Sequence, residues 1–137
     1  MRVLALDYGS ARCGCAVSDP TGTLATPLEV VQSPASRRGL ATVRRLTVEL
    51  GVQRVIVGLP LSLSGGDSEQ TREARSFSDR LAGELSVPVE LYDERLTTQL
   101  AARTGGRASE DSRAAAHLLE GWLASAQAGG SPGRDDV

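Results

Sequence analysis

The sequence contains no lysine, and all 15 of its basic residues are arginine. It has 17 acidic residues and a formal net charge of −2, which excludes binding of nucleic acid through bulk positive charge. Any contact with nucleic acid must therefore involve a local patch. The planar guanidinium matches phosphate geometry better than a lysine ammonium does. A GC-biased genome is nevertheless the stronger explanation for the missing lysine, because Ala, Gly and Val are abundant.

Long hydrophobic runs and cysteine pairs are also missing. No stretch approaches the roughly 20 apolar residues of a membrane span, and the N-terminus reaches Asp7 before an apolar run attains signal-peptide length. The sequence therefore predicts a cytoplasmic protein with no membrane contact. The only two cysteines, Cys13 and Cys15, are two apart on a predicted strand and cannot form a disulfide or complete a metal site by themselves. We expect both to be buried as small hydrophobic residues.

The length of 137 residues and the 40% hydrophobic content suit one ordinary domain with its own core. We expect this domain to span residues 1–127. The remaining residues, 128–137, are rich in Gly, Ser and Pro and have no apolar pattern. They are expected to form a disordered tail.

The first part of the chain predicts three strands separated by turns. They are Val3–Asp7, Cys13–Ser18 and Leu24–Val31. Short turns between successive strands favour an antiparallel meander. Pro27 cannot donate a ladder hydrogen bond, so the third strand is expected at an edge.

The rest of the chain alternates helical periodicity with apolar runs. Residues 54–59 form a continuous apolar run, as expected for a central parallel strand that is covered on both faces. The remaining predicted elements are a helix over residues 33–51, a helix that ends near Pro88, a strand Val87–Tyr92, a short helix Thr97–Arg103 and a long helix Ser109–Ala126. This order predicts an α/β fold, in which a ribonuclease-H-like mixed five-stranded sheet (an antiparallel meander plus two parallel strands) is flanked by helices.

Acidic residues from distant parts of the chain are expected to meet at one edge of this sheet. Asp7 ends the first strand and Asp93-Glu94 follow the fifth, and the carboxyl ends of parallel strands emerge at the same edge. Asp111 continues the apolar stripe of the last helix that faces the sheet. Carboxylate oxygens suit Mg²⁺ or Mn²⁺, and such a site supports phosphodiester hydrolysis. The sequence therefore predicts a metal-dependent nuclease site.

Each of these acids also has a purely structural explanation. Asp111 could be a helix-start carboxylate favoured by the macrodipole, Asp93 and Glu94 could be ordinary loop acids, and Asp7 could serve the following turn. The spacing does not separate Asp93 from Glu94. His117 lies off the Asp111 stripe and is expected to face solvent rather than to act as a general base.

Four segments resemble, in the right order, those of the YqgF/RuvX family. They are Leu4–Ser10 with Gly14–Asp19, Val57–Pro60 with the Ser/Gly-rich loop after it, Tyr92–Thr98, and Asp111–Ala116 with Leu118-Leu119. The opening Asp-x-Gly alone is weak, whereas the Asp-Glu-Arg-Leu-Thr block is quite specific. The resemblance spans about residues 1–122.

The resemblance implies a ribonuclease-H-like nuclease whose partner is nucleic acid, either structured RNA or branched DNA. Its role would be maturation of the 5′ end of pre-16S rRNA or resolution of Holliday junctions. The family's catalytic and metal-binding acids fall on Asp7, Glu94 and Asp111, with Mg²⁺ or Mn²⁺ as cofactor.

The chain departs from the family pattern at two basic segments. Ala11-Arg12 stands where many relatives carry Lys-Arg, and the stretch 103–110 is shorter and less basic than in many relatives. Weaker phosphate contacts are expected as a result. Candidate substrate-binding residues are Arg12, Arg72, Arg95 and Arg107, each of which could equally be an ordinary surface charge.

Two other protein classes remain open. The opening hairpin also resembles the phosphate loop of actin-like ATPases and sugar kinases, but those enzymes close two domains around the nucleotide. A non-catalytic module of the same fold that binds nucleic acid or protein is the second alternative. Symmetric cleavage of a four-way junction would need a homodimer, which the sequence leaves open.

Overall fold

The computed structural model describes residues 1–59, 68–93 and 110–127. The predicted helix Thr97–Arg103 and the predicted tail 128–137 lie outside these ranges. The strands are β1 (Val3–Asp7), β2 (Arg12–Ser18), β3 (Ala25–Pro27), β4 (Val31–Gln32), β5 (Arg54–Leu59) and β6 (Val89–Asp93), and the helices are α1 (Arg37–Glu49), α2 (Glu69–Glu84) and α3 (Glu110–Gln127). None of the helices described here is long and apolar enough to cross a membrane.

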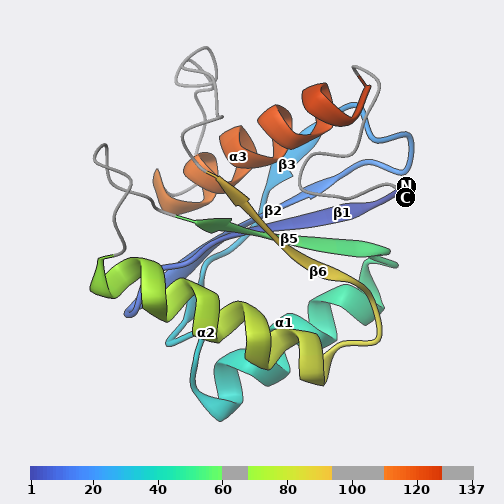
Figure 1. Cartoon of the computed structure of the whole chain (residues 1–137). Coiled ribbons are helices and arrows are strands. Elements are labelled where there is room, and N and C mark those ends of the chain that lie inside the picture. The colour runs from blue at the N-terminus through green and yellow to red at the C-terminus, as the bar shows by residue number, and fades with distance from the viewer. Residues whose placement is uncertain (60–67, 94–109, 128–137) are drawn as a thin grey trace, which may run out of the picture.

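The six strands form one mixed sheet in the order β3-β2-β1-β5-β6, with β4 beside β2 (Figure 1). β1 and β2 are antiparallel, as are β2 and β3, whereas β5 runs parallel to both β1 and β6. This confirms the predicted meander joined to two parallel strands. Pro27 lies in the edge strand β3, as predicted.

The predicted strand Leu24–Val31 is instead two short strands. Ala16 is the register partner of Pro27, whereas Cys13 is the partner of Val31. The edge chain thus advances four residues while β2 advances three, which is the pattern of a β-bulge. The extra residue breaks the edge into β3 and β4 and gives the sheet six strands rather than five.

Helices cover both faces of the sheet and create two hydrophobic cores. Successive side chains of a strand point to opposite faces, so Leu4 and Leu6 of β1 pack on the side of α1 and α2, whereas Val3 and Ala5 pack under α3. Figure 1 shows α3 on one side of the sheet and α1 and α2 on the other. Both cysteines are fully buried, free thiols in the first core, as expected.

Serine caps begin α1 and α2. Ser36 Oγ accepts a hydrogen bond from Gly39 N at 3.0 Å, and Ser68 Oγ accepts one from Thr71 N at 3.1 Å. Each such cap stabilises its helix by about 1 kcal/mol. α1 starts later than predicted because Ser33 adopts a positive φ of 43° and Ser36 N donates to Ser33 O, which forms a turn before the helix.

Candidate active site

The hairpin between β1 and β2 fixes the direction of Asp7. Asp7 belongs to the same alternating set as Val3 and Ala5, so it lies on the face of the sheet that α3 covers. Tyr8 points to the opposite face, where its ring centre lies 4.8 Å from that of Phe77 in α2. Gly9 makes the tight turn, because a Cβ there would lie 2.7 Å from the carbonyl oxygen of Arg12.

Gly14 brings the start of α3 beside Asp7. Gly14 is the register partner of Asp7 on β2, and a Cβ at Gly14 would lie 1.9 Å from the carbonyl oxygen of Asp111. Only glycine allows the backbone of α3 to approach this closely. The fully buried Ser112 adds a second attachment, because its Oγ accepts a hydrogen bond from Cys15 N at 3.3 Å. Asp7 on β1 and the first turn of α3 are therefore both direct neighbours of Gly14 on β2.

Arg12 forms an ion pair with Asp111. Its Nε donates to Oδ2 of Asp111 at 2.6 Å, with 59% of the Arg12 side chain and 40% of the Asp111 side chain exposed. Arg12, one of the four predicted substrate contacts, thus lies directly against a predicted metal ligand. The pair neutralises one carboxylate of the site while leaving much of the guanidinium open to solvent.

The charges of Asp7 and Asp111 contribute to the raised pKa of the buried Cys13 thiol. Its pKa is raised well above the ordinary value, first by a hydrogen bond with Cys15, then by burial, then by the charge of Cys15 and those of Asp7 and Asp111. Both acids therefore act on the same point of β2. This agrees with their convergence over Gly14.

The third predicted acid follows β6, two strands away from Asp7. β5 lies between β1 and β6, with Leu6 beside Val57 and Leu59 beside Asp93, so the three carboxyl ends share one edge. Asp93 belongs to the set of Val89 and Leu91, on the face of α1 and α2. It therefore lies on the opposite face from Asp7. Glu94 itself lies outside the described residues.

Asp7 and Asp111 offer carboxylate oxygens, the donors that Mg²⁺ and Mn²⁺ prefer. Within residues 1–59, 68–93 and 110–127, no group of three His, Cys, Asp or Glu side chains could hold a metal ion. The two acids fit a divalent cation chemically, and any third carboxylate must come from elsewhere in the chain.

Of the other three predicted arginines, only Arg72 lies within the described residues. Arg72 is exposed in α2, and Arg95 and Arg107 lie outside the described residues. The first turns of α2 do reach the hairpin, since Glu69, Gln70 and Glu73 line a shallow hollow of about 390 Å³ together with Ser10.

Two features of α3 differ from, or add to, the sequence predictions. His117 is half-buried rather than fully solvent-facing, and its Nε2 is buried without a hydrogen-bond partner among the described groups. Gly14 and Ser112 were not predicted as site residues, although they hold Asp111 in place. A glycine inside a strand signals the close approach of another backbone, and that signal could have identified Gly14.

Similarity to known proteins extends over nearly the whole chain. A family model described as "RuvX: Holliday junction resolvase" matches residues 1–125. The chain belongs to the RuvX family. A protein of Clavibacter michiganensis subsp. michiganensis named "Putative pre-16S rRNA nuclease" is 43% identical to this RuvX chain, over 94% of the chain and 86% of the relative. One of the same name from Anaeromyxobacter sp. is 40% identical, over 90% of the chain and 96% of the relative. RuvX membership supports a nuclease function.

Solved structures place this RuvX protein in the RuvC-like ribonuclease H fold. Thermus thermophilus RuvC superposes with a TM-score of 0.69 at 20% identity, covering 94% of this chain and 97% of RuvC. T. thermophilus RuvC in complex with a Holliday junction substrate gives 0.68 at 19% identity, covering 94% of this chain and 96% of that one. At this identity the likeness establishes the fold, which confirms the predicted fold class.

Proposed function

We propose that this protein is a metal-dependent nuclease that trims the 5′ end of pre-16S rRNA. Asp7, Glu94 and Asp111 are its catalytic acids and its ligands for Mg²⁺ or Mn²⁺. The observation that carries the proposal is the meeting of Asp7 and Asp111 over Gly14, at the edge where β1, β5 and β6 end. The backbone segments that carry these two acids approach each other there at a position that only glycine permits.

Register on β6 supports Glu94 as the third acid. Tyr92 packs under α3 and Asp93 belongs to the opposite face. Glu94 follows Tyr92 by two positions, and residues two apart on a strand share a face. Alternation along the chain therefore favours Glu94 over Asp93 as the third acid that we propose.

A bound Mg²⁺ or Mn²⁺ supplies an activated water and stabilises the charge of the leaving oxygen. The residues of the chain prepare the site for this chemistry. Tyr8 and Phe77 hold the hairpin so that Asp7 faces α3, and Gly14 and Ser112 hold the first turn of α3. Arg12 orients Asp111 through its Nε and offers the rest of its guanidinium to a phosphate oxygen. Arg72, Arg95 and Arg107 are the further substrate contacts we propose.

RNA is favoured over a four-way DNA junction because relatives that are 40–43% identical over most of the chain carry the pre-16S rRNA name. Junction resolution is the second candidate, and the description of the family model supports it. The two free, buried cysteines suit the reducing cytoplasm, where we place the protein. We assign nuclease activity to a single domain, residues 1–127, so that removal of residues 128–137 preserves cleavage.

The test is cleavage of a labelled pre-16S rRNA leader and of a four-way DNA junction, with Mg²⁺, Mn²⁺ or EDTA. Asp7→Asn, Glu94→Gln and Asp111→Asn should each abolish cleavage and weaken Mn²⁺ binding in calorimetry. Asp93→Asn is the matched control, because it removes the neighbouring charge from the opposite face and should leave both readouts near wild type. Binding of RNA without cleavage of either substrate would make the protein a non-catalytic module.

A further inference from the structure

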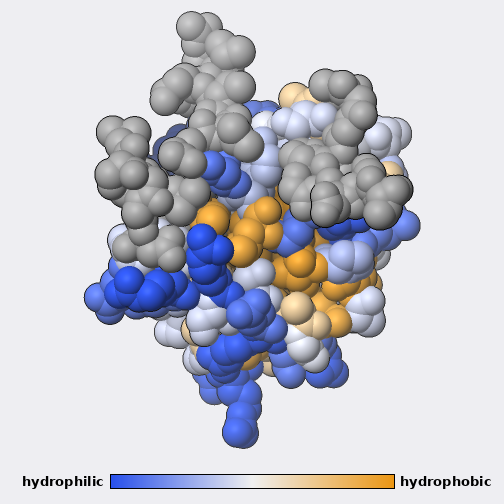
Figure 2. All heavy atoms as spheres, viewed as in Figure 1, coloured by the Kyte–Doolittle hydropathy of each residue, from blue (hydrophilic) through white to orange (hydrophobic). Residues whose placement is uncertain are grey.

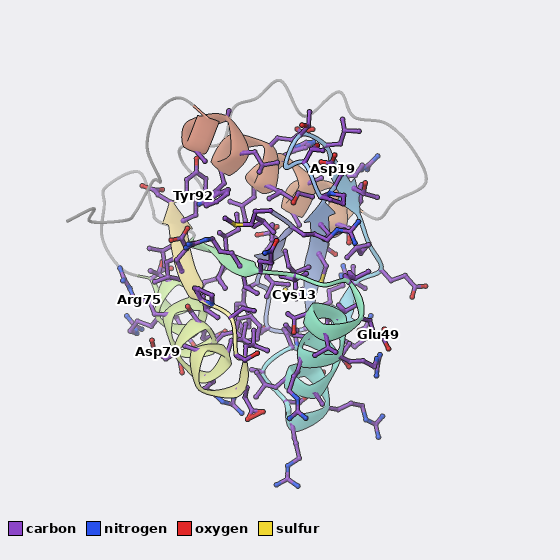
Figure 3. All side chains as sticks on the ribbon, turned by 90° about the vertical axis from the view of Figure 1, so that its right-hand side faces the viewer. Cys13, Asp19, Glu49, Arg75, Asp79 and Tyr92 are labelled. Atoms are coloured by element: carbon purple, nitrogen blue, oxygen red, sulfur yellow. The ribbon has the colours of Figure 1, made fainter. Side chains whose placement is uncertain are left out.

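One helix concentrates positive charge in this acidic protein. α1 carries four arginines and one glutamate within 13 residues, a net charge of +3, so the rest of the chain carries −5. All four arginines, Arg37, Arg38, Arg44 and Arg45, are exposed. Figure 2 shows hydrophilic side chains gathered over α1 and α2, and in Figure 3 long side chains ending in nitrogen project from α1 away from the sheet. This set of arginines is called the α1 arginine face below.

The spacing places these arginines in two rows on one side of the helix. Arg37 and Arg44 are seven residues apart, as are Arg38 and Arg45, so each pair lies nearly in line and about 10.5 Å apart along the axis. That length covers several phosphates, because a DNA duplex carries one charge per about 1.7 Å of its axis. The α1 arginine face therefore matches the backbone of a nucleic-acid helix in scale.

The first two arginines of α1 lie at positions that disfavour positive charge. Arg37 and Arg38 occupy the first turn of α1, where the positive end of the helix dipole disfavours cations, and that turn contains no acid. Arg37, Arg38 and Arg44 form no ion pair with any residue in the described parts of the chain. Arg45 has only a distant contact with Glu49, at 3.9 Å. At Arg37 and Arg38, positive charge therefore opposes helix stability.

The α1 arginine face begins beside the candidate active site. Arg12 is the register partner of Gln32, and Ser33 N donates to Ala11 O at 2.8 Å, so the turn before α1 adjoins the hairpin. Gly39 allows the start of α1 to pack closely against the Ser33 turn, since a Cβ at Gly39 would lie 2.2 Å from Ser33 O. The start of α1 and the hairpin that bears Arg12 are therefore neighbours at this edge of the sheet.

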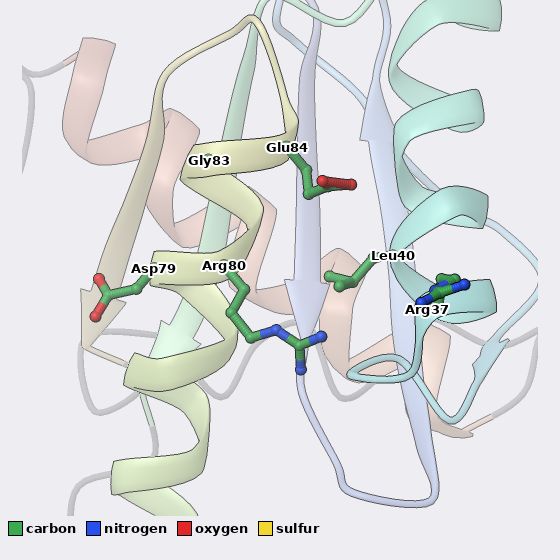
Figure 4. A pocket seen from close by; sticks show the side chains of 6 residues that line it. All are labelled: Arg37, Leu40, Asp79, Arg80, Gly83 and Glu84. Carbon is green, nitrogen blue, oxygen red and sulfur yellow. The ribbon is translucent and has the colours of Figure 1, made fainter.

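A groove between α1 and α2 borders this face. It has a volume of about 460 Å³ and is lined by Arg37, Leu40, Asp79, Arg80, Gly83 and Glu84. In Figure 4 Arg37 and Arg80 face the groove, Glu84 points toward α1, and Asp79 points away from it. Arg80 is held by its hydrogen bond to Ala35 O at 2.6 Å. The groove is of mixed charge, so the α1 arginine face, rather than the groove, forms the basic surface.

We propose that the α1 arginine face binds the phosphate backbone of a double-helical RNA stem next to the segment that is cleaved. This inference rests on the proposed function, since it names the part of the substrate that a surface outside the active site holds. Duplex RNA is recognised largely through shape and backbone contacts, which a row of arginines provides. The stem would lie along α1, and its unpaired 5′ extension would reach Arg12 and the acids.

The test compares Arg37→Gln/Arg38→Gln/Arg44→Gln with a control of equal charge change, Thr26→Glu/Gln53→Glu/Ser86→Glu, whose three positions are exposed and lie outside α1. Binding is measured in an Asp7→Asn background, against salt, for an RNA hairpin with a 5′ extension and for the extension alone. The arginine variant should lower the salt slope for the hairpin by about 2–3. The ratio of its Kd to that of the protein with the three arginines intact should then fall about sixfold for each doubling of the salt concentration. Its melting temperature should not fall.

Cleavage distinguishes this inference from the proposed function. With Asp7 restored, the arginine variant should raise KM for the hairpin about tenfold or more with little change in kcat, and cleave the extension alone as the wild type does. A wild-type salt slope and KM in the arginine variant, or an equal effect in the control, would overturn the inference even if cleavage is intact. A lowered slope in a protein that cleaves no RNA would refute the proposed function and leave the docking surface standing. Binding of a polyglutamate peptide in preference to the hairpin would replace the RNA stem with an acidic protein.

Discussion

Replacement of Gly14 by alanine tests the geometry that brings the two acids together. The added Cβ would meet the carbonyl oxygen and carbon of Asp111 at 1.9 Å and 2.3 Å, and both are backbone atoms that cannot rotate away. A contact of at least 3.0 Å requires the start of α3 to move by about 1 Å. Overpacking of this kind costs typically 1–3 kcal/mol, and we expect about 3 kcal/mol because a whole helix must shift.

The same shift carries Asp111 away from Asp7. A misplacement of about 1 Å can reduce catalysis about 100-fold, so activity should fall much more than the loss of folded protein explains. Urea unfolding gives the stability change, and the melting temperature should drop by about 10 °C for a domain of this size. Cleavage is measured at a temperature where the variant remains folded.

Gly83→Ala is the matched control. No atom of the described parts of the chain lies within 4 Å of a Cβ at Gly83, and alanine favours a helix over glycine by up to about 1 kcal/mol. This variant should be equally or more stable and fully active. Wild-type stability and cleavage in Gly14→Ala would refute the placement of α3 against β2.

Three further predictions concern single side chains. Arg12→Gln should change the free energy of unfolding by less than about 1 kcal/mol, because the ion pair with Asp111 is exposed, yet it should lower the cleavage rate at least tenfold. Arg12→Lys should restore part of the cleavage rate. A loss of cleavage no larger than the loss of folded protein would count against a role of Arg12 at the site. Glu90→Leu should lower the free energy of unfolding by about 2 kcal/mol, because the Glu90 carboxylate contacts Arg54 at 3.3 Å and Trp122 Nε1 at 2.8 Å, and the Arg54 and Glu90 side chains are only 16% and 15% exposed. Glu90→Gln should lose less stability than Glu90→Leu, and denaturant unfolding of the wild type and the two variants measures this order. Burial, then the charge of Glu73, raise the pKa of Tyr8. The stability that the protonated Tyr8 phenol contributes is therefore complete below the unfolded pKa of about 10 and is lost as pH rises through the folded pKa. Wild type should lose stability relative to Tyr8→Phe above about pH 10, and a constant stability difference from pH 8 to 11 would contradict this.

The strands and helices followed from local patterns. The alternating strands at the N-terminus, the continuous apolar run of β5 and the helical stripe of α3 each reflect which faces must be buried, and this information is local to each segment. The break between β3 and β4 was not predicted, because a bulge depends on how the edge pairs with β2 rather than on its own sequence. The start of α1 was placed too early because the turn at Ser33 imitates a helix start.

Some features of the candidate site could likewise be predicted from the sequence, whereas others depended on the tertiary structure. The amino-acid sequence alone identified Asp7 and Asp111 as acids that end a strand and begin a helix, and its motifs pointed to the RuvX family. It could not show that Gly14 joins them, that Arg12 pairs with Asp111, or that Asp93 lies on the wrong face, because each fact depends on residues that are neighbours only after β1, β2 and α3 have packed together. The catalytic, metal-binding and substrate-binding functions of all these residues, and of Glu94, Arg72, Arg95 and Arg107, stay predictions. Local patterning determined which elements form, whereas register and helix packing decided which charges meet.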